Sequence, residues 1–266
     1  LVILSTDHAG SDYGHGYNIP EHRLVPLIAV GSGMSPGAIW PAPDSVDIVP
    51  TLLDHLGIEA DTEWGLDGRV LGLEATSPPD AVLDTNLVFN GDAEYERGYD
   101  DFSPDAAVPG WTDPGYATVM QYGAPDGFPS TTDPASEDRG ANYFCGGGTT
   151  EDTTLSQTIK LEAIIAEISV GTTYDFSAYV GGYSTQDDRT EVTLHFSDSD
   201  GSVLHSATIG PLTASDRGDV TGLFEVSASG SVPTSAVSAE VIITAIRSSG
   251  YNDGYADDIS LVIHAE

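Results

Sequence analysis

Tyr174-Asp175-Phe176-Ser177-Ala178-Tyr179-Val180 alternates side chains so that Tyr174, Phe176, Ala178 and Val180 share one face. This period of two is typical of a strand with one buried face. Gly, Ser, Asp and Asn clusters separate further segments of the same kind, and no helical stretch interrupts them. Residues 86–266 are therefore predicted to form an antiparallel β-sandwich or jelly roll. The other alternating sets are Val192, Leu194 and Phe196; Phe224, Val226 and Ala228; Val241, Ile243 and Ala245; and Ile259, Leu261 and Ile263. For 161–170, a helical turn and a strand both remain open.

Residues 1–75 follow a different pattern, which predicts the tail of an α/β domain. The apolar runs 1–4 and 25–31 suit strands buried on both faces, as in a parallel sheet flanked by helices. A helix is expected next, capped by Asp44 or Ser45 or else starting near Val49 or Pro50, and ending at Gly57. Polar residues and consecutive prolines predict a linker over 76–85 between this domain and the sandwich of 86–266.

The composition is strongly acidic, with 8 Lys and Arg residues against 42 Asp and Glu residues and a formal net charge of −34. Such a charge repels nucleic acid and anionic membrane surfaces, and it is best tolerated where salt screens it. A marine or halophilic bacterial source is the hypothesis that follows. The single cysteine, Cys145, excludes an internal disulfide, and no apolar run reaches the roughly 20 residues of a membrane span. Because the chain begins with Leu1 inside an expected strand, we predict the truncated end of a longer secreted, extracellular or periplasmic protein.

An acid and a histidine, Asp7-His8, follow the first apolar run after Ser5-Thr6, and His15-Gly16 comes soon after. Open α/β sheets gather ligands at the carboxyl ends of their strands. Carboxylate and imidazole groups there predict a metal site.

Four segments together resemble the C-terminal end of the alkaline phosphatase superfamily, particularly the type I phosphodiesterase and nucleotide pyrophosphatase branch. They are Ser5-Thr6-Asp7-His8-Ala9-Gly10, Gly14-His15-Gly16-Tyr17-Asn18, 25–31 and 46–58, and the resemblance covers residues 1–73. It implies two zinc ions, one bound by Asp7 and His8 and the other by His15, with His22 as the alternative ligand. Paired zinc ions stabilise the attacking and leaving oxygens of phosphoryl transfer.

The same resemblance implies that the full-length protein is a metal-dependent phosphoric-ester hydrolase, a phosphatase or phosphodiesterase. Its nucleophile would lie upstream of Leu1, so no catalytic residue is assigned here and the fragment alone is expected to be inactive. Sulfatases share this tail and are the alternative. The absence of a lysine between His8 and Val25 favours phosphate esters.

The second part is similar to the carbohydrate-binding-module-like, galactose-binding-type jelly rolls. The similarity rests on Asn86-Leu87-Val88-Phe89-Asn90-Gly91-Asp92-Ala93-Glu94, on Gly110-Trp111, and on residues 155–159 and 255–261. It implies a calcium ion held by Glu94 and Asp258, with Asp92 and Asp257 in reserve, since calcium prefers oxygen ligands. It also implies binding of a polysaccharide or cell-surface glycan, so a non-catalytic carbohydrate-binding or adhesion protein is a further alternative.

Sugar binding needs exposed aromatic rings beside polar groups. The alternation does not say which aromatic residues are exposed, so none is assigned to a sugar site. Three histidines of the sandwich, His195, His205 and His264, are interpreted as ordinary strand side chains. The aromatic candidates are Trp111, Tyr116, Tyr122, Tyr143, Tyr183 and Tyr251.

Overall fold

A computed structural model describes two units of the chain, Leu1–Glu74 and Ala75–Glu266. The residues described are 2–5, 27–30, 47–58, 80–95, 98–102, 108–113, 117–149 and 151–265.

The first unit contains two short paired strands, β1 (Val2–Leu4) and β2 (Ile28–Val30). They run antiparallel, with Val2 opposite Val30, and the exposed fractions of these two residues are 67% and 63%. The expectation of parallel strands buried on both faces is therefore wrong for these segments. An α/β sheet of the alkaline-phosphatase type is not found within the described part of this unit. An apolar run predicts a buried strand, but hydrophobicity alone does not reveal whether another element covers that strand.

A helix follows as expected, α2 (Ile48–His55). Pro50 lies in its first turn, where the missing N–H leaves no intrahelical bond unmade. Gly57 lies just past the end, with a φ of 66°, in the left-handed conformation that glycine adopts at no steric cost. The start at Ile48 is nearer to the later of the two predicted positions.

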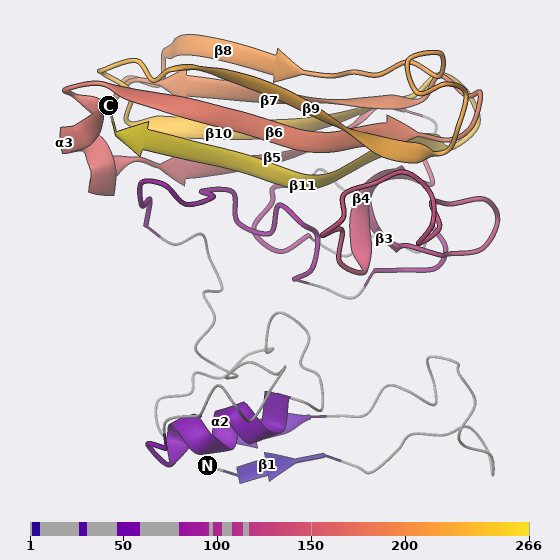
Figure 1. Cartoon of the computed structure of the whole chain (residues 1–266), viewed down its shortest axis with the longest axis horizontal. Helices are drawn as coiled ribbons and strands as arrows, with labels where there is room; N and C mark the ends of the chain where they lie inside the picture. Colours follow the sequence, from indigo (N-terminus) through magenta and orange to yellow (C-terminus); the bar gives the residue numbers. More distant parts are fainter. Residues whose placement is uncertain are drawn as a thin grey trace. The chain divides into compact units, whose positions relative to one another are not determined.

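The second unit is a sandwich of two sheets, which confirms the all-β fold expected there (Figure 1). One sheet has the order β5-β10-β7-β8 and the other β3-β4-β11-β6-β9, with every neighbouring pair antiparallel. From β6 onward most connections cross between the sheets, as in a jelly roll. The strands are β3 (Thr118–Gln121), β4 (Asn142–Gly147), β5 (Thr153–Lys160), β6 (Thr172–Gly182), β7 (Arg189–Ser197), β8 (Val203–Ile209), β9 (Gly222–Ser231), β10 (Ser238–Ile246) and β11 (Asn252–Ala265).

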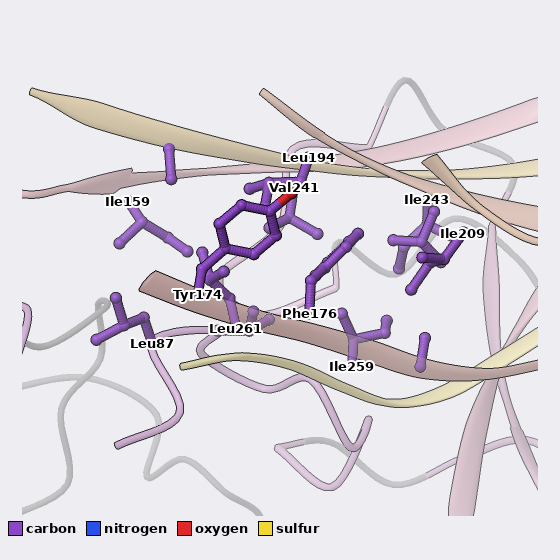
Figure 2. Close-up of a cluster of buried hydrophobic side chains, with 14 of the residues drawn as sticks. Leu87, Ile159, Tyr174, Phe176, Leu194, Ile209, Val241, Ile243, Ile259 and Leu261 are labelled. Atoms are coloured by element: carbon purple, nitrogen blue, oxygen red, sulfur yellow. The ribbon is translucent and has the colours of Figure 1, made fainter. Parts of the chain in front are cut away.

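The inward-facing side chains of both sheets form one core, in which the alternating residues of the sequence meet (Figure 2). Phe176 on β6 and Leu194 on β7 are fully buried, as their spacing predicted. On β9, however, Phe224 and Val226 are only half-buried, because this strand is at the edge of its sheet and has a neighbour on one side alone. Between β5 and β6 the chain forms η3 (Glu162–Ile164) and α3 (Ile165–Ile168), so the open alternative is decided in favour of a helical turn.

The segment that leads into the sandwich lies along β11. The Leu87 N–H donates to the Leu261 carbonyl at 2.8 Å, and Asn86 forms an isolated antiparallel bridge with Val262. On the other side, the Gln157 side chain of β5 accepts from the Phe89 N–H and donates to the Phe89 carbonyl, both at 2.8 Å. One side-chain amide thus replaces the backbone partner that a neighbouring strand would supply.

Candidate functional site

The predicted zinc ligands Asp7, His8, His15 and His22 lie outside the described residues. The phosphoric-ester hydrolase, its sulfatase alternative and the two zinc ions therefore stay predictions. Among the residues that are described, no group of three or more His, Cys, Asp and Glu side chains is arranged to hold a metal ion.

An aromatic pocket, with a cavity volume of about 290 Å³, opens at one end of the sandwich. Four segments far apart in the sequence build it. They come together because Gly181 at the end of β6 pairs with Tyr255 near the start of β11, and because Tyr99 forms a bridge with Met120 of β3. The lining residues are Asp100, Asp101, Phe102, Asp126, Gly127, Phe128, Tyr183, Gln186, Tyr251, Asp253 and Tyr255.

Aromatic rings dominate the apolar part of this pocket. The Phe102 ring lies between Phe128 and Tyr251, with both ring centroids 5.0 Å away and interplanar angles of 79° and 54°. Tyr251 is 58% exposed and Tyr183 is 37% exposed. Rings supported by other rings on one side and open to solvent on the other can stack on a flat apolar ligand face.

The Tyr183 ring lies against the backbone of Gly127. A Cβ atom built at Gly127 would be 2.8 Å from Tyr183 Cε2, and the φ of this glycine is 96°. Only glycine has both the space and the conformational freedom required there. The loop after β3 and the loop after β6 are therefore fitted closely to each other.

Buried polar groups hold the other wall of the pocket in place. Asp188 is fully buried, and its carboxylate accepts from the Ser248 hydroxyl at 2.7 Å, the Gln186 amide at 3.1 Å and the Asp253 N–H at 2.9 Å. The Asp253 carboxylate accepts from the Tyr255 hydroxyl at 3.2 Å. Burial, and then the charge of Asp188, raises the pKa of Asp253. This carboxyl is thus less solvated than an ordinary surface aspartate and well placed to bind a donor.

A second hydrophobic cluster underlies the pocket on the face of the five-stranded sheet away from the main core. Met120, Tyr143 and Tyr255 are fully buried in it, and Phe102 and Phe128 pack against it. The pocket rings are therefore anchored on packed side chains rather than carried on free loops.

The structure separates the aromatic candidates of the sequence into buried and exposed residues. Trp111 is buried, and its indole N–H donates to the Asn90 carbonyl at 3.0 Å. Tyr122 and Tyr143 are also buried, whereas Tyr183 and Tyr251 line the pocket. Tyr116 lies outside the described residues.

Sequence reasoning missed Phe102, Phe128 and the acidic residues beside them. No periodic pattern marks them, because they belong to loops. The one available signal was their place in Gly- and Asp-rich segments, where a large apolar side chain has no strand to cover it.

The residues predicted for calcium lie at the junction between the entering segment and β11. Glu94 Oε1 accepts from the N–H groups of Ala141 and Asn142, both at 2.7 Å. Asp258 has a φ of 47°, and its Oδ2 atom is buried without a hydrogen-bond partner. Burial is the main cause that raises the pKa of Glu94 and of Asp257, and neighbouring carboxylates add to it.

An orphaned oxygen among carboxylates that repel one another fits a cation. The described residues offer no set of three acidic ligands there, so the remaining ligands would be backbone or amide carbonyls and water. Asp92 and Asp258 also line a neighbouring cavity of about 520 Å³.

Of the three sandwich histidines, His264 differs from an ordinary strand side chain. Its Nδ1 lies 2.7 Å from Asp84 Oδ1 and its Nε2 lies 3.2 Å from Asp175 Oδ2. These hydrogen bonds, that to Asp84 first, raise the pKa of His264. His205 Nε2 lies 2.9 Å from the Tyr174 hydroxyl, and His195 lies on β7.

No helix in the described ranges combines the length and the apolar character needed to cross a membrane. No protein-family model matches the chain, and no curated protein matches it.

Several solved structures are similar to the chain, among them a carbohydrate-binding module. The enzymatically active domain of bacteriophage CBA120 tailspike protein 4 has 16% identity and a TM-score of 0.36, with 68% of this chain and 22% of that chain covered. An arabinose-bound α-L-arabinofuranosidase, MgGH51, has 18% identity and a TM-score of 0.38, with 70% and 30% covered. A family 16 carbohydrate-binding module has 17% identity and a TM-score of 0.36, with 57% and 89% covered. The chain thus spans less than a third of the tailspike and arabinofuranosidase chains, and its own residues have to carry any functional argument.

Proposed function

We propose that the unit Ala75–Glu266 binds a carbohydrate chain in the aromatic pocket at the end of its sandwich. The observation that carries this proposal is the pair of exposed rings, Tyr251 and Tyr183, held over a concave surface by Phe102 and Gly127. Sugar rings present an apolar face to such side chains, and stacking removes both surfaces from water.

Polar groups beside the rings supply the second requirement. The carboxylates of Asp101, Asp126 and Asp253 line the same pocket, and each oxygen can accept from a sugar hydroxyl. Because Asp253 is held by its own hydrogen bonds to Asp188 and Tyr255, it offers a fixed acceptor, which costs little entropy on binding. Rings for stacking beside fixed acceptors for hydroxyls are what carbohydrate recognition requires.

The test compares Tyr251→Ala and Tyr251→Phe in the full chain against a panel of soluble polysaccharides, by affinity electrophoresis and then calorimetry. We expect Tyr251→Ala to weaken binding about tenfold or more, which corresponds to about 1.4 kcal/mol. Tyr251→Phe keeps the ring and should retain most of the affinity. Val170→Ala is the control, because Val170 is also strongly exposed but lies next to the opposite end of β6.

Failure to bind any member of the panel would contradict the proposal, and so would equal binding by the wild type and Tyr251→Ala. Far-UV circular dichroism of each variant shows that the sandwich is intact. Since Tyr251 is mostly exposed, its loss should leave stability within about 0.5 kcal/mol of the wild type.

A further inference from the structure

The aromatic pocket is negatively charged, although stacking on its rings does not require a charge. Four of its lining residues are aspartates, Asp100, Asp101, Asp126 and Asp253, and its described lining contains no Lys, Arg or His. A neutral glycan needs acceptors and donors in comparable numbers, since each sugar hydroxyl both donates and accepts. A wall whose charged groups are all carboxylates favours a ligand that brings positively charged donors.

Three described arginines contact residues in or next to the pocket lining, but their hydrogen bonds are not made to its acids. Arg217 is buried, and its guanidinium donates to the backbone carbonyls of Gly182, Ser184, Gln186 and Val220. The Arg247 Nε donates to the Gly250 carbonyl at 2.8 Å, and the Arg189 Nη1 donates to the Asp187 carbonyl at 2.9 Å. All three guanidinium groups donate to backbone carbonyls, and these hydrogen bonds do not reach the acids of the pocket.

Asp253 is the acid best placed to distinguish an ammonium from a hydroxyl group. It is half-buried beside the fully buried Asp188, whose carboxylate is already satisfied by several donors. A cation that approaches Asp253 would relieve the repulsion between the two carboxylates. A hydroxyl can also donate to this carboxylate, but an ammonium adds the attraction of opposite charges to the same hydrogen bond.

We infer that the pocket is built for an amine-bearing glycan, a chain of glucosamine units, and that it disfavours glycans carrying uronate or sulfate groups. The inference rests on the proposed function, because it names the class of carbohydrate that the same rings would stack on. The acids Asp100, Asp101 and Asp126 are exposed at the rim, where they attract cationic groups and repel anionic ones before contact. Asp253 then receives the ammonium beside the stacked ring.

The experiment uses three hexasaccharides with the same β-1,4 linkage that differ at C2: glucosamine, N-acetylglucosamine and glucose. Binding to the full chain is measured by calorimetry at about pH 5.5 in about 0.15 M salt, which screens long-range attraction to the acidic surface. We expect the glucosamine oligomer to bind about tenfold more tightly than the two neutral oligomers. A galacturonate hexamer should not bind.

Asp126→Asn removes one pocket charge, and asparagine tolerates the φ of 66° found at this position. The matched control, Asp200→Asn, makes the same change of net charge in the exposed turn between β7 and β8. We expect Asp126→Asn to lower the preference for the amine about threefold or more, with Asp200→Asn unchanged.

Equal affinity for the amine and the neutral oligomers would overturn the inference, and so would equal effects of Asp126→Asn and Asp200→Asn. If the neutral oligomers bind as tightly as the glucosamine oligomer, and if Tyr251→Ala weakens that binding, the proposed function holds and only the charge selectivity is wrong. If no oligomer binds, or if Tyr251→Ala changes nothing, both the function and the inference fail.

Discussion

Gln157 offers a direct measure of how the entering segment is held to the sandwich. Its side chain is 3% exposed and makes three hydrogen bonds, from the Phe89 N–H and to the carbonyls of Phe89 and Gly110. Gln157→Met keeps the length and volume of the side chain but leaves these three backbone groups without partners.

The size of the effect follows from these three groups. An orphaned buried polar group costs about 1–3 kcal/mol. The three groups share one site and can relax together, so the sum is discounted to about 3–5 kcal/mol. For a unit of this size, each kcal/mol lowers Tm by about 2–4 °C, which gives a fall of about 6–20 °C.

Urea unfolding of the full chain, followed by circular dichroism, measures the loss directly. Thr158→Met is the control, because it places the same side chain at the next, exposed position of β5 and should change stability by less than about 0.5 kcal/mol. Gln157→Glu tests the same contacts through the direction in which stability changes with pH. At neutral pH its carboxylate faces two carbonyls and is disfavoured in the folded state, so its folded pKa is raised and the stability of this variant increases as pH falls.

If Gln157→Met unfolds within about 1 kcal/mol of the wild type, the three contacts do not hold the segment as described. A Gln157→Glu variant whose stability is independent of pH would refute the same reasoning.

Three further predictions concern other parts of the fold. Millimolar calcium should raise Tm by several degrees and chelation should reverse the rise, since a calcium concentration about 100-fold above Kd adds about 2.7 kcal/mol of stability. Glu94→Gln should abolish the shift, and an unchanged wild-type Tm would contradict a cation at the junction between the entering segment and β11. His264 has a raised folded pKa from its contacts with Asp84 and Asp175, so the stability that it contributes is present below about pH 6.5 and is lost as pH rises through the folded pKa. His264→Gln should therefore lower Tm at about pH 5 but not at about pH 9, and equal shifts of Tm at both pH values would exclude the ion pairs. Gly181→Ala places a Cβ against a backbone carbonyl of β9 and should leave little soluble folded protein, whereas wild-type yield and Tm would show that the two strands can separate.

The core of the sandwich could be predicted from sequence because burial on one face imposes a period of two along each strand. Phe176, Leu194 and Val241 all lie where that period placed them. The same logic failed for Val2 and Val30, whose apolar character indicated burial, because their neighbours in space are not encoded in their own pattern.

The aromatic pocket was beyond prediction for a geometric reason. Phe102 and Tyr251 are about 150 residues apart, and their contact depends on the pairing of β3 with β4 and of β4 with β11. The alternation marks which residues face the core, but it carries no information on which loops meet at an end. The predictions of secretion, of a halophilic source and of phosphate-ester hydrolysis remain to be tested.

The pairing of the entering segment with β11 has a mechanical consequence. Backbone N–H groups donate to backbone carbonyls from Asp84 to Ile263, from Leu87 to Leu261 and from Ile259 to Gly91. The chain therefore enters and leaves the sandwich at the same end. A load applied between residue 80 and residue 265 would peel these bonds apart one after another instead of shearing them together. Tension between the two ends of the chain would therefore detach this segment first. A force applied through a ligand in the aromatic pocket, at the far end, would instead be resisted by the strands of both sheets.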